Sequence, residues 1–156
     1  LPPGTGDIQL TLTQKLKLTG AVIVTTPQDL ALADVKKGAD MFNKVQTPIL
    51  GVIENMSGLF LSGNTNNPRS KIYINNEELE IDVNGDFNIN IDIFKKDGGQ
   101  KESKRLGVPL LGKIPLSKEI MNATDSGIPI VVSDTNQKTG EVYFSLADKV
   151  SKIIKL

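Results

Sequence analysis

Cysteine, histidine and tryptophan are all missing from this chain of 156 residues. Without cysteine, neither a disulfide framework nor a thiolate metal site can form, and without histidine no imidazole can bind a metal. Any metal site would have to use oxygen ligands. The same absences exclude catalytic arrangements of the Cys–His and Ser–His–Asp kinds.

An excess of charge of one sign is also missing. The chain has 18 Lys and Arg residues and 18 Asp and Glu residues, so its formal net charge is zero. This balance offers no electrostatic reason to expect nucleic acid or an anionic membrane as a partner. No apolar run approaches the roughly 20 residues of a membrane helix, and the first residues do not form a basic region followed by an apolar stretch. We therefore expect a cytoplasmic protein whose partners include no nucleic acid and no membrane.

A strand, a helix and a second strand are predicted near the start of the chain. Residues 20–26 carry a continuous apolar run, which is typical of a parallel strand covered on both faces. Thr26 is placed to cap a helix that has Pro27 in its first position and runs to about Val45. A strand over 48–55 then completes a βαβ unit.

The middle of the chain predicts an insertion. Residues 56–76 are rich in Ser, Gly and Asn and are expected to form an irregular loop. Apolar and polar residues then alternate over 79–83 and 87–93, on either side of the turn sequence Asn-Gly-Asp at 84–86. This pattern predicts a β-hairpin with one apolar face, lying outside the parallel sheet.

The other segments complete a layered pattern. We expect a short helix within 8–19, a helix over 98–106 that ends at Gly107, a strand over 108–115, a helix from its cap Ser117 to Ser126, an extended segment over 128–132 and a helix over 140–154. This order of elements is typical of an α/β layered domain with a mainly parallel sheet. The length is that of one domain and suffices to bury a core.

Three features could carry chemistry, and each has a plainer interpretation. The glycines of residues 1–7 could let backbone N–H groups hold an anion, although short Gly/Pro loops are commonly surface turns. Asn55 follows a strand end, where ligands bind in open α/β sheets, and its amide could read an adenine edge or simply end the strand in a turn. Lysines of the last helix could meet a membrane surface, but a solvated helix face fits them better.

Five blocks of sequence, taken together and in order, resemble the Mrp-type P-loop ATPases, a family of iron–sulfur cluster carriers related to MinD and ParA. The blocks are Leu-Pro-Pro-Gly-Thr-Gly-Asp at 1–7, Gly-Ala-Val-Ile-Val-Thr-Thr-Pro-Gln-Asp at 20–29, Leu-Gly-Val-Ile-Glu-Asn-Met-Ser at 50–57, Leu-Gly-Val-Pro-Leu-Leu-Gly-Lys-Ile-Pro-Leu at 106–116 and Asp-Ser-Gly-Ile-Pro-Ile-Val at 125–131. The resemblance covers most of the chain except about 61–92, the predicted insertion.

The resemblance implies a deviant Walker A P-loop fold and a homodimer that sandwiches nucleotide, with ATP and Mg bound by the full-length parent. Asn55 matches the position that contacts adenine, and Pro115 with Leu116 matches the second wall of the base pocket. The switch II-like accessory residues, which would lie near the γ-phosphate and the dimer interface, are Gly4, Thr5, Gly6 and Asp7. Iron–sulfur client proteins are the partners that the resemblance implies.

The sequence departs from the family in two ways. Neither Gly-x-x-x-x-Gly-Lys-Ser/Thr nor Gly-x-Gly-x-x-Gly after a strand occurs, so the half that holds phosphate and magnesium is absent. Residues 1–156 would then be the C-terminal portion of one P-loop NTPase domain, inactive alone and without a catalytic residue of its own. The family's Cys-x-x-Cys falls here near Leu61 and Asn64, and neither residue can ligate an iron–sulfur cluster.

Two other hypotheses remain open from the sequence. The chain could be a non-enzymatic half-domain that docks onto a partner, or a membrane-associated, MinD-like positioning ATPase that uses its last helix as an anchor. A partial parallel sheet should also leave one strand edge unpaired. We therefore expect the isolated chain to be marginally stable or to self-associate unless that edge is covered.

Overall fold

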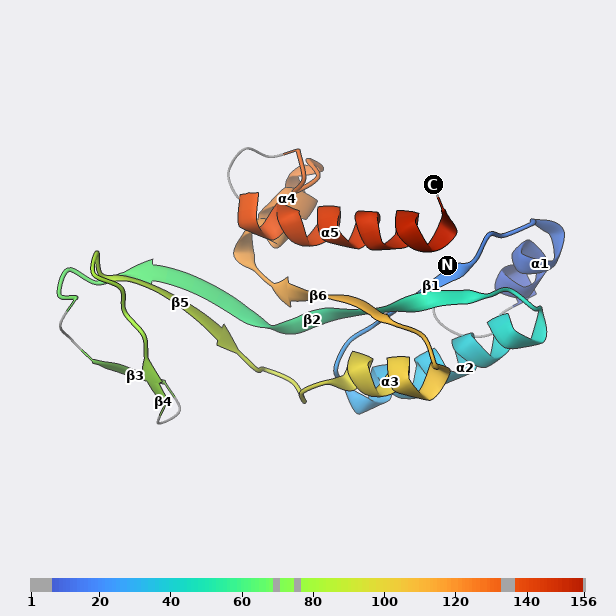
Figure 1. Ribbon diagram of the computed structural model, residues 1–156, viewed down its shortest axis with the longest axis horizontal. Helices are drawn as coiled ribbons and strands as arrows, with labels where there is room; N and C mark the ends of the chain where they lie inside the picture. The colour runs from blue at the N-terminus through green and yellow to red at the C-terminus, as the bar shows by residue number, and fades with distance from the viewer. Residues whose placement is uncertain (1–6, 69–70, 75–76, 133–136, 156) are drawn as a thin grey trace.

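The computed structural model describes residues 7–68, 71–74, 77–132 and 137–155 (Figure 1). The elements in chain order are α1 (Asp7–Lys15), β1 (Ala21–Thr25), α2 (Asp29–Lys44), β2 (Ile49–Asn64), β3 (Ile72–Ile74), β4 (Glu77–Leu79), β5 (Asp86–Ile91), α3 (Gly98–Leu106), β6 (Leu110–Leu116), α4 (Lys118–Ser126) and α5 (Gln137–Ile154). The predicted α/β order is confirmed, and the last helix begins three residues earlier than expected.

Strand β2 is the centre of the sheet. It pairs in parallel with β1 on one side and with β6 on the other. Helices α2 and α3 cover one face of this parallel part, and α4 and α5 lie on the other (Figure 1). The predicted α/β layered architecture with a mainly parallel sheet is therefore confirmed, and the structure shows helices on both faces of that sheet.

Each face of the sheet has its own small apolar core. On the side of α2, buried Ile23, Ala39 and Val52 pack together, with the partly buried Val35 and Phe42 of α2 against them. On the side of α5, the buried residues are Leu111, Ile114 and Leu146, and the partly buried Val142 and Val150 pack against them. The apolar stripe of α5 is therefore used for packing on the sheet.

Serine and glycine form the helix ends expected around α3 and α4, but the cap expected for α2 is wrong. The Ser117 hydroxyl accepts a hydrogen bond from the Ile120 N–H at 3.1 Å, and both Gly107 and Gly127 adopt the left-handed conformation that ends α3 and α4. The predicted Thr26 cap of α2 is wrong. The helix is capped at Gln28, which makes no side-chain capping bond.

Tertiary packing explains why the start of α2 is displaced. A Cβ at Gly98 would lie only 2.7 Å from the Pro27 Cα, so the two backbones are in close contact. Pro27 therefore belongs to the connection between β1 and α2, where it abuts the first residue of α3. Sequence spacing alone could not reveal this neighbour.

The predicted insertion is present but is paired differently. Residues 56–64, expected as an irregular loop, continue β2, which then pairs antiparallel with β5 from Leu59↔Ile91 to Asn64↔Asp86. The turn at Gly85 is confirmed, with φ of +86°. The strand expected over 79–83 is wrong: β4 ends at Leu79, and it joins β3 in a separate two-stranded sheet. We call the described residues 59–68, 71–74 and 77–91 the arm, since they project from the layered part of the molecule (Figure 1).

A second expected element is also different. Residues 128–132, expected to be extended, form a turn in which the Val132 N–H donates to the Pro129 carbonyl at 2.9 Å. Apolar content alone therefore gave the wrong conformation here.

The outer edge of β1 is open in the described part of the chain. There, β1 pairs with β2 alone, and Val24 is 55% exposed although it lies in a sheet strand. This agrees with the expected unpaired edge.

Truncating Leu111 should destabilise the fold. Leu111 is 2% exposed and joins the sheet to α5. We expect Leu111→Ala to lower the free energy of unfolding by about 2–5 kcal/mol, because it leaves a cavity. Leu30→Ala, at a position 79% exposed on α2, should change it by less than about 0.5 kcal/mol. Urea denaturation followed by circular dichroism measures both, and equal midpoints would contradict the assigned core.

Candidate functional site

The predicted base-site residues lie at the carboxyl ends of two neighbouring strands. Asn55 of β2 is opposite Ile114 of β6, so Pro115 is one residue further along. Asn55 and Pro115 are half-buried, whereas Leu116 is 39% exposed at the end of β6. The fold therefore brings these positions to one edge of the sheet, where ligands bind in open α/β folds.

A groove of about 650 Å³ begins beside Asn55 and follows β1. Its walls include Thr25 and Thr26 at the end of β1, and Val35 and Phe42 of α2. Pro115 and Leu116 are not among its lining residues. Asn55 thus lies at one end of a groove that follows the unpaired edge of β1, and the role of all three residues in binding a base stays a prediction.

The switch II-like residues are mostly outside the described residues. This applies to Gly4, Thr5 and Gly6. Asp7 is exposed and is the first residue of α1, where a carboxylate is favoured by the helix dipole. Their predicted role near the phosphate stays a prediction.

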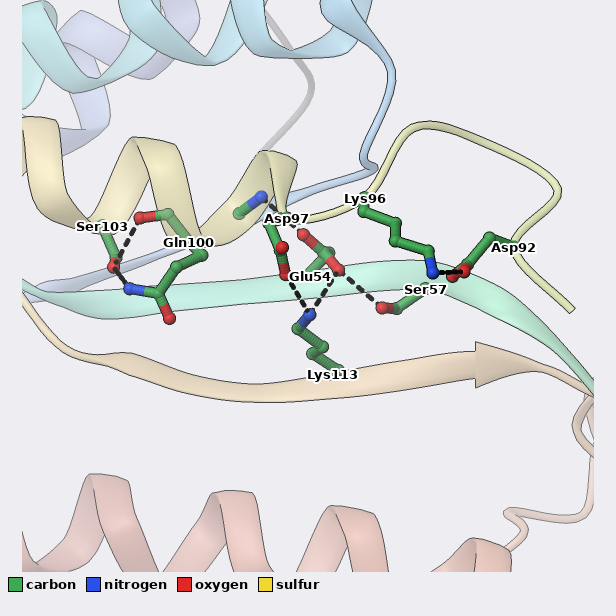
Figure 2. A network of polar contacts seen from close by, with 9 residues as sticks. Glu54, Ser57, Asp92, Lys96, Asp97, Gln100, Ser103 and Lys113 are labelled. Carbon is green, nitrogen blue, oxygen red and sulfur yellow. Dashed lines mark hydrogen bonds and ion pairs between the residues drawn. The ribbon is translucent and has the colours of Figure 1, made fainter. Parts of the chain in front are cut away.

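The most strongly organised group at this edge was not predicted from the sequence. Glu54, the last residue of β2 that pairs with β1, is 1% exposed. One carboxylate oxygen accepts from the Gly99 N–H at 2.6 Å, and the other accepts from the Ser57 hydroxyl at 2.5 Å. The Lys113 ammonium of β6 lies 3.6 Å from the second oxygen (Figure 2). The charge of Glu54 is therefore compensated by two hydrogen bonds and a cation, as a buried carboxylate requires.

Lys113 connects this carboxylate to a second one. Its ammonium donates to Asp97 Oδ1 at 2.8 Å (Figure 2). Asp97 raises the pKa of Lys113, with a further contribution from Glu54, and burial acts in the opposite direction. The hydrogen bond from Lys113 holds the pKa of Asp97 below its ordinary value.

Two glycines allow helix α3 to approach this edge closely. A Cβ at Gly99 would lie 2.8 Å from the Glu54 Cβ, and a Cβ at Gly98 would meet the backbone of Pro27. Asp97, just before them, has a φ of +62°. The N-terminus of α3 is thereby held against Pro27, which follows β1, and against Glu54 of β2. Two features of the sequence could have pointed to this contact: the adjacent glycines at 98–99 and a Glu within an apolar strand.

The resemblance implies ATP, Mg and an iron–sulfur cluster, and the residues of this chain suit only part of the first of these ligands. The amide of Asn55 beside the groove suits an adenine edge. Among the described residues, no three acidic side chains gather closely enough to bind a metal ion, and the sequence has no Walker A loop. No cysteine is present to ligate an iron–sulfur cargo. The described helices include none with the length and apolar character needed to cross a membrane.

A comparison with protein families identifies the class. The family model for the NUBPL iron-transfer P-loop NTPases, of the ParA type, matches residues 1–151. The chain therefore belongs to this family of P-loop NTPases.

Individual relatives agree with that assignment. The chain is 41% identical over 155 residues to the iron–sulfur protein required for NADH dehydrogenase, mitochondrial, of Arabidopsis thaliana, covering 99% of this chain and 42% of the relative. It is 39% identical over 155 residues to the iron–sulfur cluster carrier protein of Aquifex aeolicus, covering 99% of this chain and 36% of the relative. The chain thus spans well under half the length of these relatives.

A solved structure supports the fold. The nucleotide-binding protein of Archaeoglobus fulgidus, determined in complex with ADP, is similar with a TM-score of 0.53 and 28% sequence identity. The similarity covers 81% of this chain and 43% of the Archaeoglobus chain. The fold is that of the P-loop NTPases, as the sequence indicated.

Removing the Glu54 carboxylate should destabilise the packing of α3 against β2. We expect Glu54→Ala to lower the free energy of unfolding by about 2–3 kcal/mol, since it leaves the buried Gly99 N–H and the Ser57 hydroxyl without their acceptor. Glu141→Ala, at an exposed position of α5, should change it by less than about 0.5 kcal/mol. Hydrogen exchange should also show faster exchange of the Gly99 amide in the Glu54 variant alone. An unchanged Gly99 amide would contradict the assigned bond.

The ion pair of Asp97 and Lys113 should give a defined pH dependence. The Asp97 pKa is lowered from 3.8, so its stabilising effect is present above that pH and is lost as pH falls through the lower, folded-state value. The Lys113 pKa is raised from 10.5, so the stabilisation that its charge provides is fully present below pH 10.5 and is lost as pH rises through the higher, folded-state pKa. The stability difference between wild type and Asp97→Asn should thus be constant between about pH 5 and 9 and shrink in stronger acid. Denaturation curves across pH test this, and a difference that persists at about pH 2 would contradict it.

Proposed function

We propose that this chain is the C-terminal portion of a nucleotide-dependent iron–sulfur carrier, whose P-loop half is supplied by sequence outside these residues. The family match over residues 1–151 carries the proposal. The open edge of β1 and its groove support it, because they lie where a further parallel strand could add. In this proposal, ATP and Mg are bound by the full-length protein.

The chain's part in nucleotide binding would be recognition of the base. Asn55 would hydrogen-bond the adenine edge, and Pro115 with Leu116 would form the other wall. The Glu54 network would hold the end of β2 in place, because it ties that strand to α3 and β6. ATP, when bound, supplies the free energy of a phosphoryl transfer. Phosphate and magnesium would be held by residues outside this chain.

The cargo would be handled without thiolates from this chain. Since no cysteine is present, the ligands of an iron–sulfur cluster would come from other parts of the protein or from a second protein. Iron–sulfur client proteins and a homodimer of the full-length parent are the proposed partners. A cytoplasmic location remains our expectation, although the Arabidopsis relative is named as mitochondrial.

A non-enzymatic binding module is the second candidate. The absence of cysteine from these residues favours it. A membrane-anchored positioning ATPase receives less support, since the apolar stripe of α5 packs on the sheet and Lys149 donates to the Leu111 carbonyl at 2.5 Å.

Hydrolysis assays separate the two candidates. The purified chain should hydrolyse no Mg-ATP above background, because phosphate stabilisation needs the missing half. Joining the N-terminal portion of the Aquifex aeolicus carrier in front of Leu1 should produce ATPase activity. Steady hydrolysis by the unfused chain would overturn the division of roles, and an inactive but folded fusion would favour the binding module.

The fused protein also tests the base site. Asn55→Ala should raise KM for ATP by about tenfold with little change in kcat, since it removes hydrogen bonds remote from the γ-phosphate. Asn43→Ala, at an exposed position of α2, is the matched control and should leave KM unchanged. An unaltered KM in the Asn55 variant would remove the base-site assignment.

A further inference from the structure

The arm presents an apolar surface that its fold leaves open. Strand pairing places Leu59 opposite Ile91 and Leu61 opposite Ile89, so these four side chains share one face of the two-stranded ribbon. Leu61 is 41% exposed. In Figure 1 no labelled helix lies over the ribbon where it projects from the layered part. An apolar face of this kind marks an interaction surface.

A groove adjoins this face at the far end of the arm. It has a volume of about 870 Å³. Its apolar lining comes from Pro68, Leu79, Ile81 and Phe87. Phe87 also packs over Gly63 of β2, where a Cβ would lie only 2.5 Å from the ring, so one aromatic side chain belongs to both the groove and the ribbon face. Face and groove therefore form one continuous surface.

The groove is acidic, although the chain as a whole is neutral. Its charged lining residues are Lys71, Glu78, Glu80, Asp82 and Asp86. Four carboxylates and one ammonium give a formal charge of −3. Lys71 lies 2.9 Å from Glu78, so that pair is internally neutralised.

The remaining carboxylates differ in how far the arm itself uses them. Asp82 Oδ1 accepts from the N–H groups of Asn84 and Asp86 at 2.8 Å, and Asp86 Oδ1 accepts from the Asn64 amide at 2.7 Å. Oδ1 of Asp82 and of Asp86 thus accepts hydrogen bonds within the arm, whereas these bonds do not use the Oδ2 atoms. Glu80 is exposed and is the position at which charge can be changed without touching these loop bonds.

We propose that the arm docks a segment of a partner protein in which Lys or Arg residues are interspersed with apolar ones. Apolar side chains would cover the face around Leu61 and Phe87, and the cations would meet the carboxylates of the groove. Charge complementarity selects this occupant, because an acidic groove repels nucleic acid and anionic lipid. A bound metal ion is disfavoured, since no suitable acidic cluster exists among the described residues.

A peptide probe tests the proposal on the complete chain. A fluorescein-labelled peptide of alternating Lys and Leu should bind with a fluorescence-anisotropy signal that weakens at high salt, because exposed charges are screened. A matched peptide of alternating Glu and Leu should not bind. Equal binding of the two peptides would overturn the charge complementarity. No nucleotide or cluster is present, so the result is independent of the proposed function.

Charge-reversal variants locate the site. Glu80→Lys should weaken binding of the Lys-Leu peptide about fivefold, whereas Glu141→Lys, the same charge change on α5, should leave it unchanged. If the two variants bind the peptide alike, the position of the charge does not matter and the docking site is refuted.

Apolar variants and the oligomeric state complete the test. Leu61→Asn should weaken binding about threefold, while Leu30→Asn, at an exposed Leu of α2, should not. Equal affinities would refute the apolar part of the surface. Light scattering distinguishes self-association: a dimer that Glu80→Lys dissociates would show that a second copy occupies the arm and would overturn the proposal.

Discussion

A buried carboxylate holds together the edge of the sheet where the site lies. Glu54 of β2 accepts a hydrogen bond from the Gly99 N–H of α3 and forms an ion pair with Lys113 of β6. One side chain therefore connects β2, α3 and β6. A buried charge is stable only with such partners. The position of α3 depends on it, and so does the path of the chain from β2 into the arm.

Strand β2 carries two kinds of structure in one continuous element. Up to Asn55 it is the central strand of a parallel sheet, and from Leu59 it is half of an antiparallel ribbon. The change occurs at Met56 and Gly58, whose φ values are +54° and +97°, and pairing with β6 is interrupted there. Ser57, between them, is bonded to Glu54. The bulge that directs the arm outward is therefore anchored to the same carboxylate.

The arm shows where local pattern is ambiguous. Alternation over 87–93 and the turn at Gly85 correctly predicted β5 and its start. The strand expected over 79–83 is wrong, because only Leu79 of that range lies in a strand, β4, which pairs with β3. A ribbon with one apolar face can pair with any neighbour of matching register. Here residues 59–64, hidden in a Ser- and Gly-rich stretch, supply the partner for β5. Strand pairing between segments this far apart in sequence cannot be predicted from the local spacing of apolar residues.

Sequence alone determined the α/β class, the order of helices and strands in the layered part, the glycine and serine ends of α3 and α4, and the family. These features depend on local pattern, capping chemistry and ordered blocks of residues, all of which are read along the chain. The expected end of the strand at Asn55 was wrong, because β2 continues to Asn64. Only the tertiary structure decided the pairing of the arm, the late start of α2 against Gly98 and the network around Glu54. Each of these arises from contacts between residues far apart in sequence, whose meeting depends on how the layers pack.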